Sequence, residues 1–275
     1  MGLLNDELLA YENMAKKMEA YAKAMAEQSK IRHPEKLGEL AERRHFDLGL
    51  LEGLGIFYVG EMVEMLLPEF IDDVDKLGVI SATNKMPIFK DRYVFPIRDI
   101  DGRIINFAGY TWKSDTRYVY GTGKYYERGN DMYGLEAFMY AQELGWAIVV
   151  EGITDKVALN NAGFMNAFAM CGTAKSEEKM WLLSSLENGV IFIHDRDKAG
   201  DETRKHWVVP RCVRINICGN VKDIDEYLNG NDDPVYRNES RLYLSNAVAE
   251  AVNWLREGKC YANKSQAIVN NITLM

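Results

Sequence analysis

The sequence predicts an α/β protein whose main sheet is parallel and carries acidic residues along one edge. A short apolar run, 147–150, ends at Glu151, and a second run, 190–193, ends at Asp195. Such β-branched runs have the length of buried strands. Segments of helical pattern lie between and after them, so the strands should be parallel and joined by crossover helices. We therefore expect both acids at the carboxyl edge of one sheet, where open parallel sheets bind ligands.

The composition is that of an ordinary globular protein, with 275 residues, 47% hydrophobic and 27% charged. No apolar run approaches the roughly 20 residues that span a bilayer, and the N-terminus lacks the pattern of a signal peptide. We therefore expect a cytoplasmic protein. The four cysteines include no pair at the short spacing of a zinc ribbon, so no structural zinc is expected.

The net charge of −8 at first argues against a nucleic-acid partner. The charge is uneven, however, because residues 85–128 hold nine basic and five acidic side chains. A local positive track is sufficient to bind phosphates. A solvated charged face would explain the same residues about as well.

The first third of the chain predicts helices over 3–29, 35–44 and 60–67, with a short further element over 70–77. The next segment predicts strands over 92–98, 103–110 and 118–120, then a helix over 131–144 that ends at Gly145. Asp101-Gly102 is a strong hairpin signal between the first two strands. Pro96 favours an edge or bulged position.

From Trp146 onward, strands and helices alternate. The expected strands are 147–150, 166–170, 190–194 and 211–217, and the expected helices are 154–162, 176–186, 199–207, 223–228 and 240–256. These elements predict four parts. They are a helical N-terminal subdomain (1–86), a basic mixed α/β subdomain (87–145), the parallel-sheet domain (146–230) and a C-terminal helical segment (231–275).

Six acidic residues fall where expected strands end or the following helices begin. They are Glu151, Asp155, Asp195, Asp197, Asp223 and Asp225. Carboxylate oxygens are preferred ligands of Mg²⁺, and two such ions can activate a hydroxyl and stabilise a leaving pyrophosphate. Gly152 and Gly172 would let the backbone approach a phosphate, and Thr173 offers a donor beside it. The pattern indicates metal-dependent phosphoryl transfer.

Three segments carry a resemblance to a known family. Glu151-Gly152-x-x-Asp155, the run 166–174 and Asp195-x-Asp197-Lys198-Ala199-Gly200 resemble the Toprim fold of primases, topoisomerases and some nucleases. The flanking segments 95–109, 128–135 and 222–228 are similar to the catalytic core of bacterial DnaG-type primases. The resemblance is strong over 87–228, faint over 35–86 and absent at both ends.

The resemblance implies a Toprim-type parallel sheet with flanking helices, preceded by a helical and a mixed α/β subdomain. It implies a DNA primase that makes short RNA primers on single-stranded DNA from ribonucleoside triphosphates, using two Mg²⁺ or Mn²⁺ ions. Glu151, Asp195 and Asp197 would be catalytic, and Asp155, Asp223 and Asp225 would complete the metal site. The template and nucleotide would be bound by Arg92, Arg117, Arg128, Gly152, Gly172, Thr173 and Lys222.

The family's zinc ribbon and helicase-binding domain find no counterpart in these residues, and Arg196 and Ile224 replace the residues usual in the family. We therefore expect a bacteriophage-type primase that relies on a replicative helicase or a separate zinc-binding protein. Two alternatives remain, a Toprim nuclease and a non-catalytic module that binds nucleic acid or nucleotides. His194 is expected to be a hydrogen-bonded strand-end residue more readily than a ligand.

Overall fold

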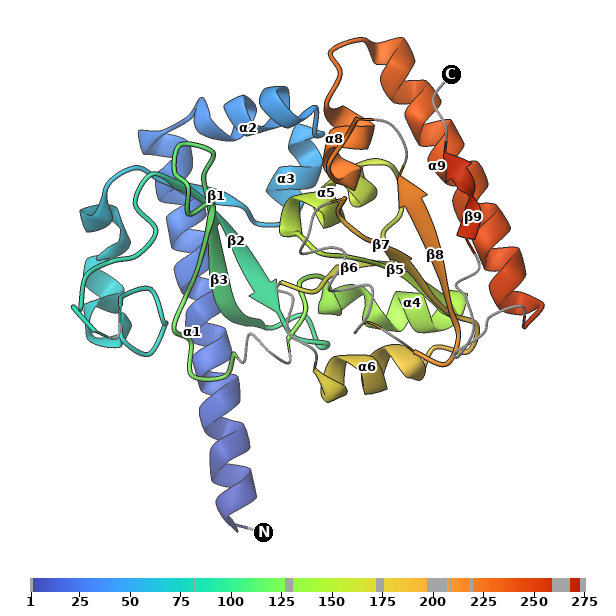
Figure 1. The fold of residues 1–275 in the computed structure, drawn as a ribbon. Coiled ribbons are helices and arrows are strands. Elements are labelled where there is room, and N and C mark those ends of the chain that lie inside the picture. The colour runs from blue at the N-terminus through green and yellow to red at the C-terminus, as the bar shows by residue number, and fades with distance from the viewer. Residues whose placement is uncertain are drawn as a thin grey trace. The chain divides into compact units, whose positions relative to one another are not determined.

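The computed structural model describes residues 2–81, 83–126, 131–171, 176–196, 207, 209–217, 220–258 and 268–272. The chain divides into two compact units, Met1–Tyr126 and Glu127–Met275, each with its own hydrophobic core (Figure 1). The expected four-part division is finer than this and stays a prediction.

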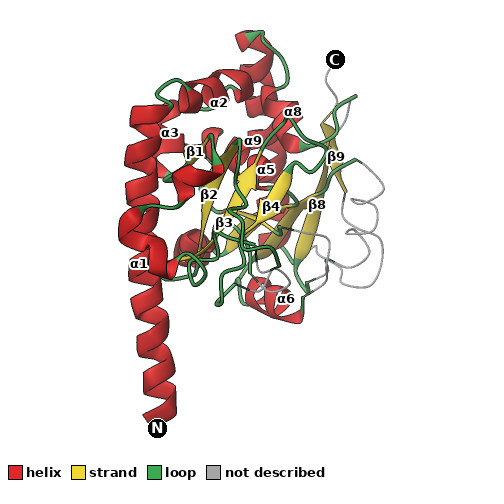
Figure 2. Ribbon diagram, turned by 90° about the vertical axis from the view of Figure 1, so that its left-hand side faces the viewer, coloured by secondary structure: helices red, strands yellow, loops and turns green. Residues whose placement is uncertain are grey.

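Unit 1 is built on a four-stranded antiparallel sheet in the order β1-β2-β3-β4. The strands are β1 (Phe57–Val59), β2 (Arg92–Arg98), β3 (Ile104–Tyr110) and β4 (Tyr118–Tyr120). The long helix α1 (Gly2–Arg32) packs on one face of this sheet, where Met18, Tyr21 and Met25 contact a core that includes Phe57 and Phe107. Figure 2 shows the N-terminal turns of α1 extending beyond the sheet.

The opposite face of this sheet carries one tyrosine from each strand in direct register. Tyr58 is opposite Tyr93, Tyr93 is opposite Tyr110, and Tyr110 is opposite Tyr118. Because side chains alternate along a strand, this row points away from α1. Aromatic pairs directly opposite one another stabilise a sheet, so the row ties all four strands together.

One expectation for the first third of the chain is wrong, and one strand there was not expected. The segment 60–67 forms only the short 3₁₀ helix η1 (Met62–Met65), which ends where Leu66 leaves the helical backbone angles, at φ −93° and ψ 62°, shortly before Pro68. Strand β1 was not expected, since three residues show no alternation and their partner β2 lies far along the chain. The remaining elements are α2 (Lys36–Arg44), α3 (Leu48–Gly53) and η2 (Pro68–Asp73).

The hairpin at Asp101-Gly102 forms as expected, with Gly102 at φ +80°. Pro96, for which an edge or bulged position was expected, lies in β2, an inner strand of the sheet. Strand β1 pairs only with Arg92–Val94, however, and the β2–β3 register shifts between Ile97 and Arg98. The proline, which has no N–H to donate, therefore sits where the β1 side of the strand is left open.

Unit 2 is built on a parallel sheet in the order β6-β5-β7-β8-β9. The strands are β5 (Trp146–Val150), β6 (Ala167–Ala169), β7 (Gly189–Ile193), β8 (Cys212–Ile217) and β9 (Ile268–Ile272). The first four confirm the expected strands, and β9 was not expected. The helices are α4 (Phe138–Leu144), α5 (Ile153–Asn161), α6 (Glu177–Ser184), α8 (Ile224–Asn229) and α9 (Pro234–Arg256).

Helices cover both faces of this sheet (Figure 1). Helices α4 and α6 bring Phe138 and Leu183 into a core with Val149 and Phe192 on one face. Helices α5, α8 and α9 lie on the other side. The expected helix over 199–207 falls outside the described residues except for Trp207, which is buried. Among the described helices, none is long and apolar enough to cross a membrane.

The helix expected over 131–144 begins late, and a bridge to the sheet takes its place. Tyr133 and Ala169 exchange both backbone hydrogen bonds at 2.9 Å, which adds a single antiparallel rung to the outer side of β6. Gly134 then turns the chain with φ +103°, and the short 3₁₀ helix η3 (Leu135–Ala137) leads into α4.

Candidate functional site

Five of the six acids predicted to form the site are described by the structure, and they lie together at the carboxyl edge of the unit 2 sheet. Glu151 follows β5 directly, and Asp155 lies in the first turn of α5. Asp195 lies two residues after β7, while Asp223 is the N-cap of α8 and Asp225 is in its first turn. This is the edge that the strand pattern predicts.

Asp155 and Asp225 are the two buried acids of this group. Only 4% of Asp155 is exposed, and its carboxylate accepts hydrogen bonds from the Gly152 N–H at 3.1 Å and the Asp225 N–H at 3.3 Å. Burial raises the pKa of the Asp155 carboxyl well above its ordinary value, and the negative charges of neighbouring aspartates raise it further. These neighbours are Asp223, Asp195 and Asp225. The negative charges of all three aspartates thus disfavour ionisation of the same buried carboxyl.

Glu151 is oriented by the segment that follows β7. Its Oε1 accepts the Asp195 N–H at 3.1 Å, and His194 Nδ1 lies 3.8 Å from the same oxygen. The His194 ring is buried and packs against Phe192 and Trp207, with centroids 5.7 and 5.3 Å away. His194 therefore packs at the end of its strand, and the hydrogen bond expected for it stays a prediction.

Lys222 brings a positive charge to the rim of the cluster. Its Nζ lies 3.5 Å from Asp195 Oδ2, and its carbonyl accepts the Arg196 N–H at 2.7 Å. These two contacts join the segments that follow β7 and β8. The neighbouring Lys156 is directed elsewhere, since its Nζ lies 3.7 Å from Glu136 and over the Tyr133 ring.

The donor chemistry of this cluster fits a divalent cation, because a buried carboxyl crowded by other carboxylates gains most from a bound positive charge. Within the described residues, no group of three His, Cys, Asp or Glu side chains is arranged to hold a metal ion. Asp197 lies outside the described residues, as do Gly172, Thr173 and Arg128. The structure therefore shows where the acids converge and leaves their ligand roles as a prediction.

Gly152 has a different local role from the one expected. A Cβ at this position would lie 2.5 Å from Asp155 Oδ2. The absence of a side chain lets the Asp155 carboxylate reach the Gly152 N–H. The glycine thus serves the buried acid directly, and contact with a phosphate stays a prediction.

Of the basic residues predicted in unit 1, Arg117 and Arg92 lie in very different surroundings. Arg117 is exposed. Arg92 is only 8% exposed, and its terminal nitrogens donate to the carbonyls of Thr116 and Arg117, both at 3.0 Å. Burial lowers the pKa of the Arg92 guanidinium. Two of the five guanidinium N–H donors of Arg92 thus bond to loop carbonyls, and its direct contact with template or nucleotide stays a prediction.

Profiles of two known domains match the sequence. The N-terminal domain of the DNA primase catalytic core matches residues 35–139, and a Toprim-like domain matches residues 148–228. The second match spans the whole acidic edge described above. The chain carries a DnaG-type DNA primase catalytic core.

Curated DNA primases are similar to this primase core over part of their length. The primase of Aquifex aeolicus (strain VF5) is 35% identical over 195 residues, covering 70% of this chain and 38% of that protein. The primase of Pseudomonas aeruginosa is 40% identical over 149 residues, covering 53% and 22%. That of Escherichia coli (strain K12) is 37% identical over 115 residues, covering 41% and 20%. The chain thus spans well under half the length of these relatives.

Solved structures share the fold of the core. A DnaG primase catalytic domain bound to single-stranded DNA superposes with a TM-score of 0.70 at 21% identity, covering 90% of this chain and 82% of that chain. The E. coli primase catalytic core gives 0.69 at 22% identity, covering 89% and 83%. The α/β fold class is therefore confirmed, and the Toprim-like domain implies a divalent metal.

Sequence reasoning missed an aromatic and basic stack on unit 1 of the core. The Trp112 ring stacks on Tyr93, with centroids 5.2 Å apart, and the Arg43 guanidinium lies 4.6 Å from the Trp112 ring centre. Arg44 lies over Tyr110 and bonds its hydroxyl. No pattern in the sequence links α2 to the β3–β4 loop, so folding alone brings these residues together.

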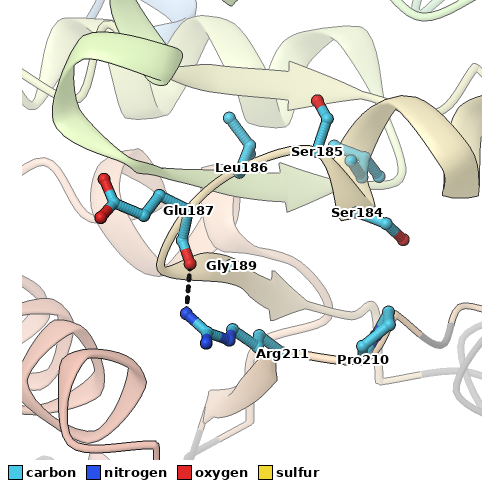
Figure 3. A pocket seen from close by; sticks show the side chains of 8 residues that line it. Ser184, Ser185, Leu186, Glu187, Gly189, Pro210 and Arg211 are labelled. Carbon is cyan, nitrogen blue, oxygen red and sulfur yellow. Dashed lines mark hydrogen bonds between the residues drawn. The ribbon is translucent and has the colours of Figure 1, made fainter.

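One pocket of unit 2 lies away from the acids. It has a volume of about 340 Å³ and is lined by Leu183, Ser184, Ser185, Leu186, Glu187, Gly189, Pro210 and Arg211. Gly189 begins β7 and Arg211 precedes β8, so the pocket is at the amino edge of the sheet. Figure 3 shows Arg211 donating to the Glu187 carbonyl across it. It is not part of the acidic site.

Proposed function

We propose that this chain is the polymerising core of a DNA primase, which joins ribonucleotides into short RNA primers on single-stranded DNA. The observation that carries the proposal is the convergence of acids on buried Asp155 at the carboxyl edge of the Toprim-like sheet. The match of residues 35–139 to the primase N-terminal domain favours this activity over that of a Toprim nuclease. Primase structures that contain single-stranded DNA support the choice of template.

The proposed metal ligands are all acids of unit 2. Glu151, Asp195 and Asp197 would hold the catalytic ions, and Asp155, Asp223 and Asp225 would complete the site. Two Mg²⁺ or Mn²⁺ ions would lower the pKa of the primer 3′-hydroxyl and neutralise charge on the triphosphate. The Asp195 N–H, at 3.1 Å from Glu151 Oε1, would hold Glu151 in a ligating orientation.

The proposed substrate contacts are basic or small residues. Lys222, whose Nζ is already 3.5 Å from Asp195, would bind the nucleotide triphosphate, with Gly172 and Thr173 beside it. Arg117 and Arg128 would bind template phosphates. A replicative helicase or a separate zinc-binding protein is the proposed partner. A solved Aquifex aeolicus primase structure contains zinc-binding and RNA polymerase domains.

The test supplies single-stranded DNA, labelled ribonucleotides and Mg²⁺ or Mn²⁺ to the purified chain. We expect labelled oligoribonucleotides whose formation requires both template and metal. Asp195→Asn and Glu151→Gln should each lower the rate by about 100-fold or more, because each removes a charge that stabilises the transition state.

The matched control is Glu187→Gln, which removes a carboxylate at the opposite edge of the same sheet. It should leave synthesis unchanged. Cleaved DNA without synthesis would support a nuclease, and nucleic-acid binding without turnover would support a non-catalytic module. Either result would overturn the primase proposal.

A further inference from the structure

The loop between β3 and β4, residues 111–117, is closed by its own backbone. The Thr111 N–H donates to the Arg117 carbonyl at 2.9 Å, and the Arg117 N–H donates to the Asp115 carbonyl at 3.1 Å. Inside the loop, the Lys113 N–H donates to Thr111 Oγ1 at 3.2 Å. Two carbonyls at the end of the loop, those of Thr116 and Arg117, also accept hydrogen bonds from outside it, which support this end of the loop.

Arg92 supplies that support from the first position of β2. Its two terminal nitrogens donate to the successive carbonyls of Thr116 and Arg117 at 3.0 Å. The Arg117 carbonyl thus accepts from both Arg92 and Thr111. The stem of Arg92 lies against Gly109, where an added Cβ would be 3.0 Å from Arg92 Cδ. A planar fork of donors on a buried stem fixes the positions of both carbonyls at once.

The Arg117 side chain is exposed just outside this clamp. No ion pair is formed by its guanidinium within the described part of the chain, whereas Lys113 in the same loop pairs with Asp91 at 3.0 Å. Arg117 is therefore a cation held at a fixed backbone position with its charge available to an anion.

We propose that Arg92 is a positioning residue, which acts on nucleic-acid binding by fixing the backbone that presents Arg117 to a phosphate of the single strand. This inference rests on the proposed template binding. It assigns the two arginines different roles, since Arg117 contacts the phosphate and Arg92 contacts only the protein.

Binding of single-stranded DNA, titrated at several salt concentrations, separates the two roles. Arg117→Gln should lower the salt slope by about 0.7, the value for one phosphate contact on a single strand. Arg92→Lys keeps the positive charge but cannot span two carbonyls, so we expect about a 3- to 10-fold loss of affinity and the same drop in slope. The Arg92→Lys/Arg117→Gln double variant should lose no more slope than Arg117→Gln alone.

A second measurement follows the clamp without DNA. In Arg92→Lys, hydrogen exchange at the Thr111 amide should quicken, because the Arg117 carbonyl that it bonds is no longer held, while amides of β2 and β3 keep their protection. Arg98→Gln is the matched control on the same strand, since Arg98 pairs with Glu19 at 2.9 Å and does not contact the loop. It should change neither the slope nor the exchange at Thr111.

Wild-type affinity and slope in Arg92→Lys would overturn the proposal, because binding would then not depend on the clamp. A double variant that loses twice the slope would also overturn it, because Arg92 would then have a phosphate contact of its own. If the wild-type chain binds no single-stranded DNA, the proposed template function fails. Faster exchange at Thr111 in Arg92→Lys would then still establish the clamp, and unchanged exchange would refute it.

Discussion

At the scale of single residues, Asp155 has unfavourable electrostatic surroundings for a charged carboxylate. It combines near-complete burial with the charges of three nearby aspartates. A folded-state pKa above the unfolded value means that the protonated carboxyl favours folding. That contribution is present below the ordinary aspartate range and is lost as pH rises through the folded-state pKa.

The first prediction follows from this sign. In a chelating buffer, Asp155→Asn should gain stability relative to the wild type as the pH rises from 4 to 8, because the amide carries no charge. Its NH2 group replaces one of the two oxygens that accept backbone N–H groups, and that cost is the same at every pH. The gain should shrink as the pH falls toward 4. Urea unfolding across this range measures it, with Glu187→Gln expected to follow the wild type. Parallel curves for wild type and Asp155→Asn would contradict the inferred electrostatic strain.

At the scale of elements, the sequence predicted what local chemistry decides. The hairpin at Asp101-Gly102 formed because a glycine can adopt the positive φ of the turn, and Ser176 capped α6 by accepting the Lys179 N–H at 3.2 Å. The strands of the parallel sheet were recognisable from their apolar runs. Their carboxyl ends therefore predicted where five of the acids would lie.

What failed was decided by distant partners. Strand β1 exists because β2 pairs with it, and Glu64 of η1 is held by the distant His33 at 3.0 Å. The bonds of Arg92 had no local signal either, since its carbonyl partners come from the β3–β4 loop. The Arg43 and Trp112 stack had no local signal for the same reason.

The second prediction tests the backbone at two glycines with one chemical change. Gly102 has φ +80° and Gly38 lies within α2, and an added Cβ would meet nothing within 4 Å at either position. Gly102→Ala should destabilise the protein by about 1 kcal/mol, because alanine is strained at positive φ. Gly38→Ala should stabilise it by up to about 1 kcal/mol, since alanine favours the helix. Chemical denaturation gives both signs, and equal signs would contradict the turn assignment.

At the scale of the whole molecule, the proposed metal ligands belong to unit 2, and Arg117, the described residue proposed to bind template phosphates, belongs to unit 1. A ligand that binds the folded state stabilises the part that it contacts. The third prediction is that Mg²⁺ slows hydrogen exchange around residues 151–155 and 222–226 and leaves the amides of β2 and β3 unchanged. Asp195→Asn should remove the effect. Equal protection of both units by Mg²⁺ would contradict a metal site confined to the acids.

The rung between Tyr133 and Ala169 has a consequence for solubility. An open strand at the edge of a sheet offers unpaired N–H and C=O groups to any other chain, and so invites aggregation. Here the two 2.9 Å hydrogen bonds of Tyr133 occupy that side of β6, and Gly134, at φ +103°, turns the chain away directly afterwards. A residue with a side chain at 134 would strain this turn and lie 2.8 Å from Lys156 Cε. Loosening the rung would leave β6 as a template on which further copies could stack.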